Sequence, residues 1–228
     1  DWRDHEKSSI MLADLDAAIE AEMARSNVPG VAACIIKGGQ TVWCNGYGHA
    51  DISAEKLVTP TTPFMLASVS KTITGVALMH LVETGALGLD DPINDHLEFV
   101  VTHPSDDTSM TPRMLLSHTS GINDNWNAMG SVIVDGDSPV ALGEFLEGYL
   151  TPGGTWYNES QNFVSAGVAQ QSVYSNIGAA LAGFLVEAVS GVPFDQYCED
   201  HIFAPLEMGS TAWHLAGLDE SEVAVPYE

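Results

Sequence analysis

The longest apolar segment with helical spacing runs from Val69 to just before Gly85. Apolar side chains stand at positions 69, 73, 76, 77, 78, 79, 81 and 82, which covers almost every face of a helix. The pattern therefore predicts a helix that lies inside the protein. The prolines in residues 59–63 disfavour helix before it, and Gly85 is typical of the residue that follows the last helical turn.

Shorter patterns on either side predict further elements. Hydrophobic residues spaced along one face predict an amphipathic helix over residues 10–25. Two runs of apolar and β-branched residues, 31–36 and 41–44, predict neighbouring strands joined by a tight turn at Gly38-Gly39. A second apolar helix is predicted over residues 177–189, and it is expected to end at Ser190-Gly191.

These elements predict a division of the chain into two regions. We expect residues 1–60 to supply an N-terminal helix and the first strands of an α/β sheet region. We expect residues 61–228 to form a mainly helical region. The predicted fold class is α+β.

Composition excludes several kinds of partner. The 228 residues include 31 Asp and Glu against 7 Lys and Arg, a formal net charge of -24. Such a surface repels nucleic acid and anionic membranes, and no window of the sequence is long and apolar enough to span a membrane. Strong acidity with few lysines suggests a salty habitat.

The three cysteines do not form a disulfide scaffold. A two-residue turn at Gly38-Gly39 would place Cys34 opposite Trp43, with Cys34 and Cys44 on opposite faces of the hairpin. Buried free thiols are therefore preferred over a Cys34–Cys44 bridge.

The candidate nucleophile is Ser68, at the start of the first apolar helix. Lys71 stands three residues later, so the two side chains share a helix face. A serine hydroxyl needs a base within hydrogen-bond reach, and burial together with the positive end of the helix dipole disfavours a charged lysine. Read alone, Ser-x-x-Lys is a weak signal, because a surface Ser and Lys one turn apart have the same spacing, and only its position before a buried helix makes the two interpretations about equal.

Tyr174 and Asn176 stand just before the second apolar helix, in a layout similar to that at Ser68. A phenol beside a lysine ammonium ionises more easily and can act as a base or a proton shuttle. The Asn176 amide could hold Lys71 or a substrate carbonyl. Read alone, Tyr-Ser-Asn is an ordinary helix cap.

Other candidate sites are weaker. The histidines show no metal-binding spacing, so we expect no metal site and no cofactor. Gly-x-Ser-x-Gly is absent. His118 and Ser120, two residues apart in a polar turn, are expected to have structural roles.

Six segments occur in an order that is specific in combination. They are Phe64–Lys71 (FMLASVSK), Leu81–Gly85 with Leu89–Pro92 (LVETG and LDDP), Leu115–Gly121 (LLSHTSG), Tyr174–Asn176 (YSN) and Phe203–Met208 (FAPLEM).

With these segments, from about residue 12 to about residue 214, the chain resembles the serine β-lactamase and penicillin-binding-protein superfamily. The similarity is to the branch of class C β-lactamases, D-alanyl-D-alanine carboxypeptidases and family VIII esterases. The resemblance implies a β-lactamase/transpeptidase-like fold. It also implies Ser68 as the acylated nucleophile, Lys71 as its base or proton relay, Tyr174 as the second acid–base group and Asn176 as a contact to substrate and lysine. The Ser68 backbone N–H would be one oxyanion donor.

The sequence departs from the family pattern in two places. The family's third motif, a Lys- or His-containing strand that lines the site, has no convincing copy before Glu228, and two or three strands are too few for the family's sheet. We expect the remaining strands beyond residue 228, in the missing C-terminal part of the same protein. In addition, residues 157–173 separate a Pro-Gly turn from Tyr174 and are expected to form an extra loop near the site.

The sequence thus predicts a serine hydrolase that acts through an acyl-enzyme on a small-molecule or peptide acyl substrate. Ester or peptide bonds rank before β-lactams. The alternative is a non-catalytic penicillin-recognising binding module or an incomplete fragment. With no leader at Asp1, the protein is either cytoplasmic or a mature exported form, and a periplasmic or extracellular location is preferred.

Overall fold

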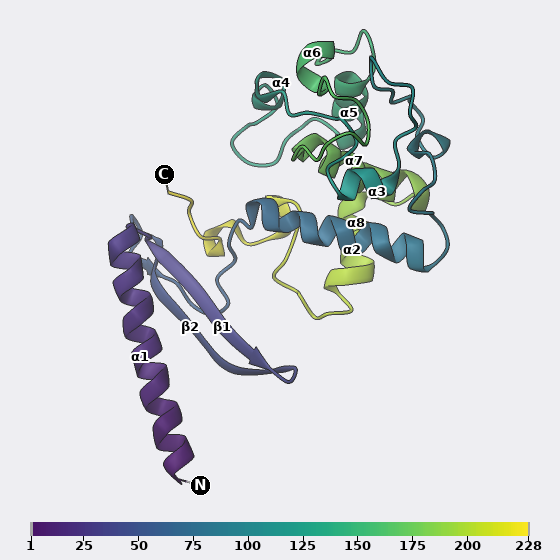
Figure 1. Ribbon diagram of the computed structural model, residues 1–228. Coiled ribbons are helices and arrows are strands. Elements are labelled where there is room, and N and C mark those ends of the chain that lie inside the picture. The colour runs from purple at the N-terminus through teal and green to yellow at the C-terminus, as the bar shows by residue number, and fades with distance from the viewer. Residues whose placement is uncertain (1, 228) are drawn as a thin grey trace. The chain divides into compact units, whose positions relative to one another are not determined.

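The computed structural model describes the backbone of residues 2–227 and the side chains of residues 14–227. The chain forms two compact units (Figure 1). The first contains the residues up to Met65 and those from Leu218 onward, and the second is Leu66–Gly217. The first unit thus extends past residue 60 and also takes in the end of the chain.

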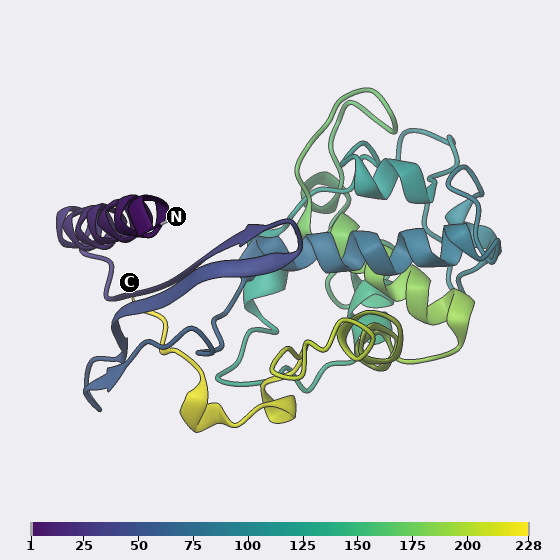
Figure 2. The same cartoon turned by 90° about the horizontal axis from the view of Figure 1, so that it is seen from below.

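The first unit is a long helix and a small antiparallel sheet. Helix α1 spans Trp2–Ser26, which is longer than the predicted helix. Strands β1 (Gly30–Lys37), β2 (Gln40–Asp51) and β3 (Lys56–Leu57) follow in the sheet order β1-β2-β3. The β1–β2 hairpin is a long twisted ribbon (Figure 2). Its apolar side chains are more exposed than predicted: Ile36 is 60% exposed and Val42 is 54% exposed.

The hairpin register corrects the prediction for the cysteines. The turn is the expected one, with both Gly38 and Gly39 at positive φ and Lys37 paired with Gln40. The register then shifts between Ile35 and Ile36, because β2 contains one extra residue. This bulge places Cys34 opposite Cys44 instead of Trp43, and the two form a disulfide. The preference for free thiols was therefore wrong for this pair, whereas Cys198 is free and buried.

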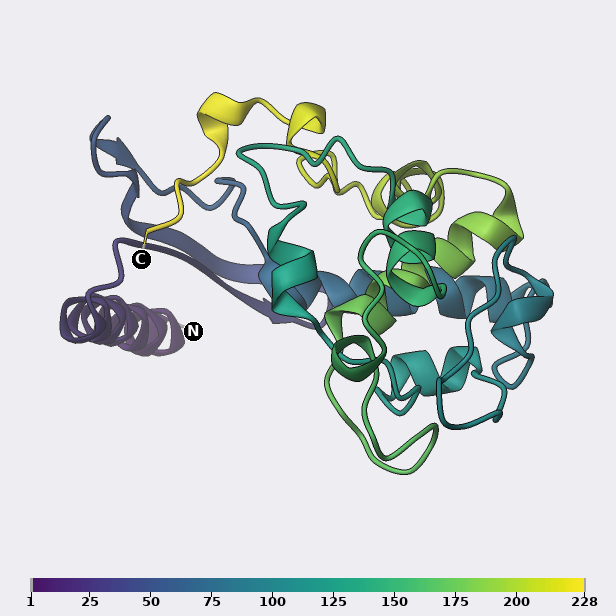
Figure 3. The same cartoon turned by 90° about the horizontal axis from the view of Figure 1, so that it is seen from above.

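The C-terminal segment returns to the sheet of the first unit (Figure 3). The N–H of Val225 donates to the carbonyl of Ala50 at 2.8 Å, and the N–H of Ala224 donates to the carbonyl of Pro63 at 2.9 Å. Ala224 also packs with Ala50 and Val58 in a small apolar cluster. These contacts explain why the residues from Leu218 onward belong to the first unit.

The second unit is helical. Helix α2 spans Ser70–Glu83 and is preceded by a 3₁₀ turn, Ala67–Val69. Short 3₁₀ turns also cover Ile93–Asp95 and Leu215–Gly217, and another lies in the first unit at Glu220–Glu222. The remaining elements are α3 (Pro112–Leu116), α4 (Trp126–Gly130), α5 (Leu142–Leu150), α6 (Glu159–Asn162), α7 (Asn176–Ser190), α8 (Phe194–Cys198) and a π turn (Glu199–Phe203).

Both predicted apolar helices are present, and each ends at the expected glycine. After α2, Gly85 has φ +75°. The N–H of Ala86 donates to Leu81 and that of Gly85 donates to Val82, which are the two hydrogen bonds of a Schellman motif. Gly191 ends α7 in a left-handed conformation.

Helices α2, α5 and α7 share the main core, in which Leu78, Leu146, Leu181 and Leu185 are fully buried. The prediction that α2 is covered on all faces was wrong. Val76 is 50% exposed, because α2 packs its buried residues along one side. Within the described residues, no single helix is long and apolar enough to cross a membrane, although the bent pair Asn176–Ser190 with Phe194–Phe203 has the length and composition to do so.

Candidate active site

Ser68 stands in the tight turn that leads into α2. Ala67, directly before it, has φ +46°, a left-handed value that is uncommon for a residue with a side chain. Ser68 then lies in the 3₁₀ turn and is exposed. Lys71 stands one turn further on, and its Nζ lies 3.3 Å from the Ser68 Oγ. The structure therefore brings the predicted nucleophile and lysine into contact.

The start of α7 contributes the other two predicted residues. Ser175 caps this helix, because its Oγ accepts from the N–H of Gly178 at 2.8 Å. Tyr174 stands directly before this cap residue, and its hydroxyl donates to the Ser68 Oγ at 2.7 Å. Asn176 is the first helical residue, and its Oδ1 accepts from the Lys71 Nζ at 2.6 Å. All four predicted site residues thus form one connected group.

The charge of Lys71 affects the phenol of Tyr174. The Lys71 Nζ lies 4.9 Å from the centre of the Tyr174 ring. The hydrogen bond with Lys71 lowers the pKa of Tyr174 below its usual value, and the hydrogen bond between Tyr174 and Ser68 lowers this pKa further. A lowered pKa raises the fraction of phenolate near neutral pH, and the phenolate is the form that accepts a proton. The group can therefore take a proton from Ser68 and return it.

Two further side chains contact this group and were not assigned to it from the sequence. Asp124 accepts hydrogen bonds from the Ser175 hydroxyl and from the backbone and side chain of Asn176. His118 lies against Tyr174, with ring centres 4.7 Å apart, and its Nδ1 accepts from the N–H of Ser175. No local pattern marks Asp124, because its partners lie more than fifty positions later in the chain.

His118 differs from a free histidine. Burial lowers its pKa, and the nearby charge of Lys71 lowers it further. A neutral ring is required for Nδ1 to accept the Ser175 N–H. Ser120, by contrast, is 1% exposed, and its Oγ accepts from the N–H of Ile122. These contacts give Ser120 a role in holding the turn.

The extra loop, residues 157–173, lies along the segment that carries His118 and Asp124. The loop contains the short helix α6, where the sequence predicted no regular structure. The N–H of Asn123 donates to Asn162, that of Val164 to Gly121 and that of Val173 to His118, at 2.8–2.9 Å. The loop therefore supports residues 118–124 from outside.

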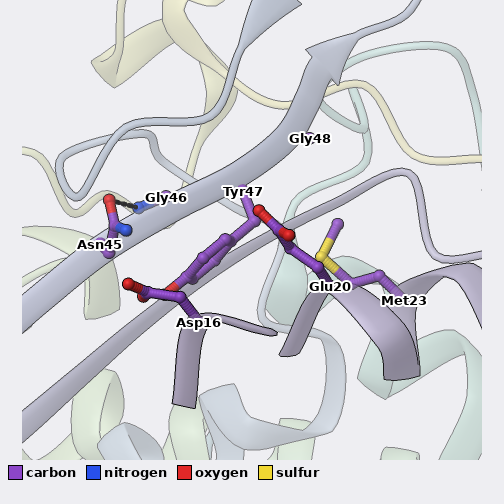
Figure 4. A pocket seen from close by; sticks show the side chains of 7 residues that line it. All are labelled: Asp16, Glu20, Met23, Asn45, Gly46, Tyr47 and Gly48. Atoms are coloured by element: carbon purple, nitrogen blue, oxygen red, sulfur yellow. Dashed lines mark hydrogen bonds between the residues drawn. The ribbon is translucent and has the colours of Figure 1, made fainter. Parts of the chain in front are cut away.

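Two hollows within the described residues do not have Ser68 in their lining. One, of about 440 Å³, lies in the first unit between α1 and β2 (Figure 4). There the Tyr47 hydroxyl donates to the carboxylate of Asp16, and Glu20 stands beside it. The other, of about 540 Å³, lies between His103 and the extra loop. Among the described residues, no three His, Cys, Asp or Glu side chains are arranged to hold a metal ion.

Known proteins are similar to this chain in sequence and in fold. "Protein flp" of Staphylococcus aureus (strain MW2) is 26% identical over 220 residues, which cover 94% of this chain and 41% of flp. The octameric penicillin-binding protein homologue from Pyrococcus abyssi has a TM-score of 0.72 at 32% identity, over 87% of this chain and 44% of that one. The D-amino acid amidase from Ochrobactrum anthropi SV3 has a TM-score of 0.73 at 25% identity, over 94% of this chain and 57% of that one.

These likenesses confirm the predicted superfamily and the predicted β-lactamase/transpeptidase-like fold. The chain spans less than half the length of the curated relative flp. The family model for Beta-lactamase matches residues 15–228. The chain belongs to the Beta-lactamase family.

Proposed function

We propose that the protein is a serine hydrolase that cleaves ester or amide bonds through an acyl-enzyme on Ser68. The observation that carries the proposal is the position of the Ser68 Oγ. It lies 2.7 Å from the Tyr174 hydroxyl and 3.3 Å from the Lys71 Nζ, so two groups that can move a proton contact an exposed hydroxyl. A nucleophile and base in hydrogen-bond contact, with the base held by a third group, is the arrangement that activates serine.

The reaction has two halves. Ser68 Oγ attacks the carbonyl carbon while its proton passes to the pair Tyr174–Lys71, and a tetrahedral oxyanion forms. The backbone N–H of Ser68 is proposed as one donor to this oxyanion. When the intermediate collapses, the bond to the leaving group breaks and the leaving group takes the proton from the pair. Water then attacks the Ser68 ester, the pair accepts and returns a proton, and the acid is released.

The charges of the second unit bear on the substrate. Lys71 and Arg113 are the lysine and arginine residues of Leu66–Gly217. Arg113 is bound by both carboxylate oxygens of Asp90, each at 2.8 Å. Lys71 is engaged by Asn176 and Ser68. Leu66–Gly217 therefore holds no further Lys or Arg for a substrate carboxylate, and recognition of β-lactams or D-alanyl peptides, both of which carry one, is proposed to depend on residues outside this unit.

One similar protein supports the proposal. The D-amino acid amidase, at 25% identity, is by its name an enzyme that cleaves amides. The family's third motif has no convincing copy in this chain. We therefore propose that the natural full-length protein supplies the second oxyanion donor and the remaining sheet strands from residues beyond 228.

The test is intact mass of the natural full-length protein after exposure to a fluorophosphonate and, separately, to a penicillin. We expect one covalent adduct that disappears in Ser68→Ala. The matched control is Ser70→Ala, which removes a hydroxyl in the same turn, outside the contacts of Ser68 with Lys71 and Tyr174. We expect this control to label like the wild type.

The two reagents separate the outcomes. Labelling by the fluorophosphonate alone would favour esters and amides, whereas labelling by penicillin would move β-lactams and D-alanyl peptides to first place. A folded full-length protein that forms no adduct with either would overturn the proposal and favour a non-catalytic binding module.

A further inference from the structure

Asp124 stands just before α4 and faces the first turn of α7. Its carboxylate receives four hydrogen bonds from three consecutive residues. One Oδ accepts from the Ser175 hydroxyl and the Ile177 N–H, both at 3.1 Å. The other accepts from the Asn176 N–H at 3.0 Å and from the Asn176 Nδ2 at 2.7 Å. The bond to Nδ2 links Asp124 to the proposed reaction.

This bond decides which end of the Asn176 amide faces Lys71. An ionised carboxylate only accepts hydrogen bonds, so the amide must turn its NH₂ toward Asp124. Its oxygen is then directed to the other side, where it accepts from the Lys71 Nζ at 2.6 Å. A reversed amide would set its NH₂ against the lysine ammonium, donor against donor. Asp124 thus excludes the orientation of Asn176 that cannot hold Lys71.

The position of Asp124 is itself supported. The extra loop is hydrogen-bonded to the backbone immediately before Asp124. The N–H of Asn123 donates to the carbonyl of Asn162 at 2.8 Å, and the N–H of Val164 donates to the carbonyl of Gly121 at 2.9 Å. On the other side, Asn125 is buried and caps α4. The backbone that carries the carboxylate is therefore held from both sides before any substrate arrives.

We propose that Asp124 is a positioning residue for acylation, which acts through Asn176 to hold Lys71 against Ser68. The inference rests on the proposed function of Ser68. It adds a residue that does not contact the reacting atoms and that acts on Lys71 through the amide of Asn176. A displacement of about 1 Å within a catalytic group can cost about 10²-fold in rate, so loss of this contact should be measurable.

A structural role must be separated from the positioning role, because Asp124 also accepts hydrogen bonds from the backbone N–H groups of Asn176 and Ile177 at the start of α7. Such groups lack partners within the helix, and a carboxylate there stabilises the helix end. Ser175→Ala provides the control for this effect. It removes the cap to Gly178 and one donor to Asp124, but it leaves the contacts Asp124–Asn176–Lys71 in place.

The variant to test is Asp124→Asn in the natural full-length protein. It keeps the shape of the side chain but replaces one acceptor with a donor. Either that donor faces the N–H of Ile177, or it faces Asn176 and allows the amide to reverse. We expect the rate of labelling by a fluorophosphonate to fall by about 10²-fold. For Ser175→Ala we expect a fall in melting temperature similar to that of Asp124→Asn, with labelling within about threefold of wild type.

The decisive measurement is whether the effect depends on Asn176. In an Asn176→Ala background the route is already broken, so Asp124→Asn should change the labelling rate by less than about threefold. The same loss in both backgrounds, or a wild-type rate in Asp124→Asn, would overturn the inference. So would a loss in Ser175→Ala as large as that in Asp124→Asn, because the effect would then belong to the helix end.

Failure of the proposed function has a different signature. In that case the wild type forms no adduct on Ser68, and the contact between Asp124 and Asn176 is tested by thermal unfolding instead. Melting temperatures of the two single variants and the double variant should then be non-additive if Asp124 holds Asn176. Additive melting temperatures would refute the contact, whatever the outcome at Ser68.

Discussion

Replacement of Tyr174 by phenylalanine removes the hydroxyl that lies nearest to the proposed nucleophile. That hydroxyl is 2.7 Å from the Ser68 Oγ, whereas the Lys71 Nζ is 3.3 Å away. The variant therefore leaves only the more distant group to move the proton. A positioned acid–base group contributes about 10²- to 10⁴-fold, and the remaining lysine should keep the loss near the lower end, at about 10²- to 10³-fold. This loss corresponds to about 3–4 kcal/mol in the barrier.

The fold should be little affected, which separates chemistry from stability. Tyr174 is 51% exposed, and surface substitutions of this kind change the free energy of unfolding by about 0.5 kcal/mol or less. The assay is the rate of fluorophosphonate labelling as a function of pH, with the melting temperature measured in parallel. Because the pKa of Tyr174 is lowered, the wild-type rate should rise with pH through a value below 10, and the variant should lack this rise.

Tyr157→Phe is the matched control, since it removes a tyrosine hydroxyl beside the hollow at His103 and Phe163. We expect its rate and pH profile to match those of the wild type. Labelling of Tyr174→Phe within about threefold of wild type, with an unchanged pH profile, would refute the reasoning that the hydroxyl moves the proton.

Three further predictions concern stability. Leu181→Ala, at a fully buried position in α7, should lower the free energy of unfolding by about 2–5 kcal/mol in a denaturant titration, and a loss below about 1 kcal/mol would show that the core relaxes around the cavity. The pKa of His118 is lowered, so its contribution to the free energy of unfolding is complete above the unfolded pKa of 6.5 and is lost as the pH falls below that value. His118→Asn should remove this part of the acid destabilisation. Parallel curves of unfolding free energy against pH for the two proteins, between pH 7 and 5, would contradict this prediction. With a net charge of -24, the melting temperature should rise between low and molar salt as repulsion is screened, and a melting temperature that does not respond would count against the hypothesis of a salty habitat.

The sequence predicted those features that depend on neighbouring residues. The apolar patterns after Ser68 and Tyr174 predicted two helices, and both are present as α2 and α7. The glycines at 85 and 191 predicted their ends, since a residue without a side chain adopts positive φ at little cost. The sequence also selected Ser68, Lys71, Tyr174 and Asn176 as candidates, because the short motifs that contain them resemble those of a known superfamily, and their catalytic roles stay predictions.

The register of the hairpin and the partial exposure of α2 are two features that local sequence patterns did not predict. A single extra residue in β2 moves Cys44 into register with Cys34, and no local pattern in Val42 or Trp43 marks the bulge. The apolar residues of α2 predicted burial on all faces. How much of a helix is covered depends on which elements pack against it, and Val76 is left half exposed.

The sequence by itself determined the positions and ends of the two apolar helices, α2 and α7, and the residue types proposed for the site, because these follow from patterns a few residues long. Only the tertiary structure decided that the Ser68 Oγ contacts the hydroxyl of Tyr174, 106 positions away, and that Lys71 contacts Asn176, 105 positions away. It also decided that Asp124 orients that amide. Such contacts depend on how the chain folds back on itself, and an isolated aspartate in a loop carries no periodic signal of its distant partner.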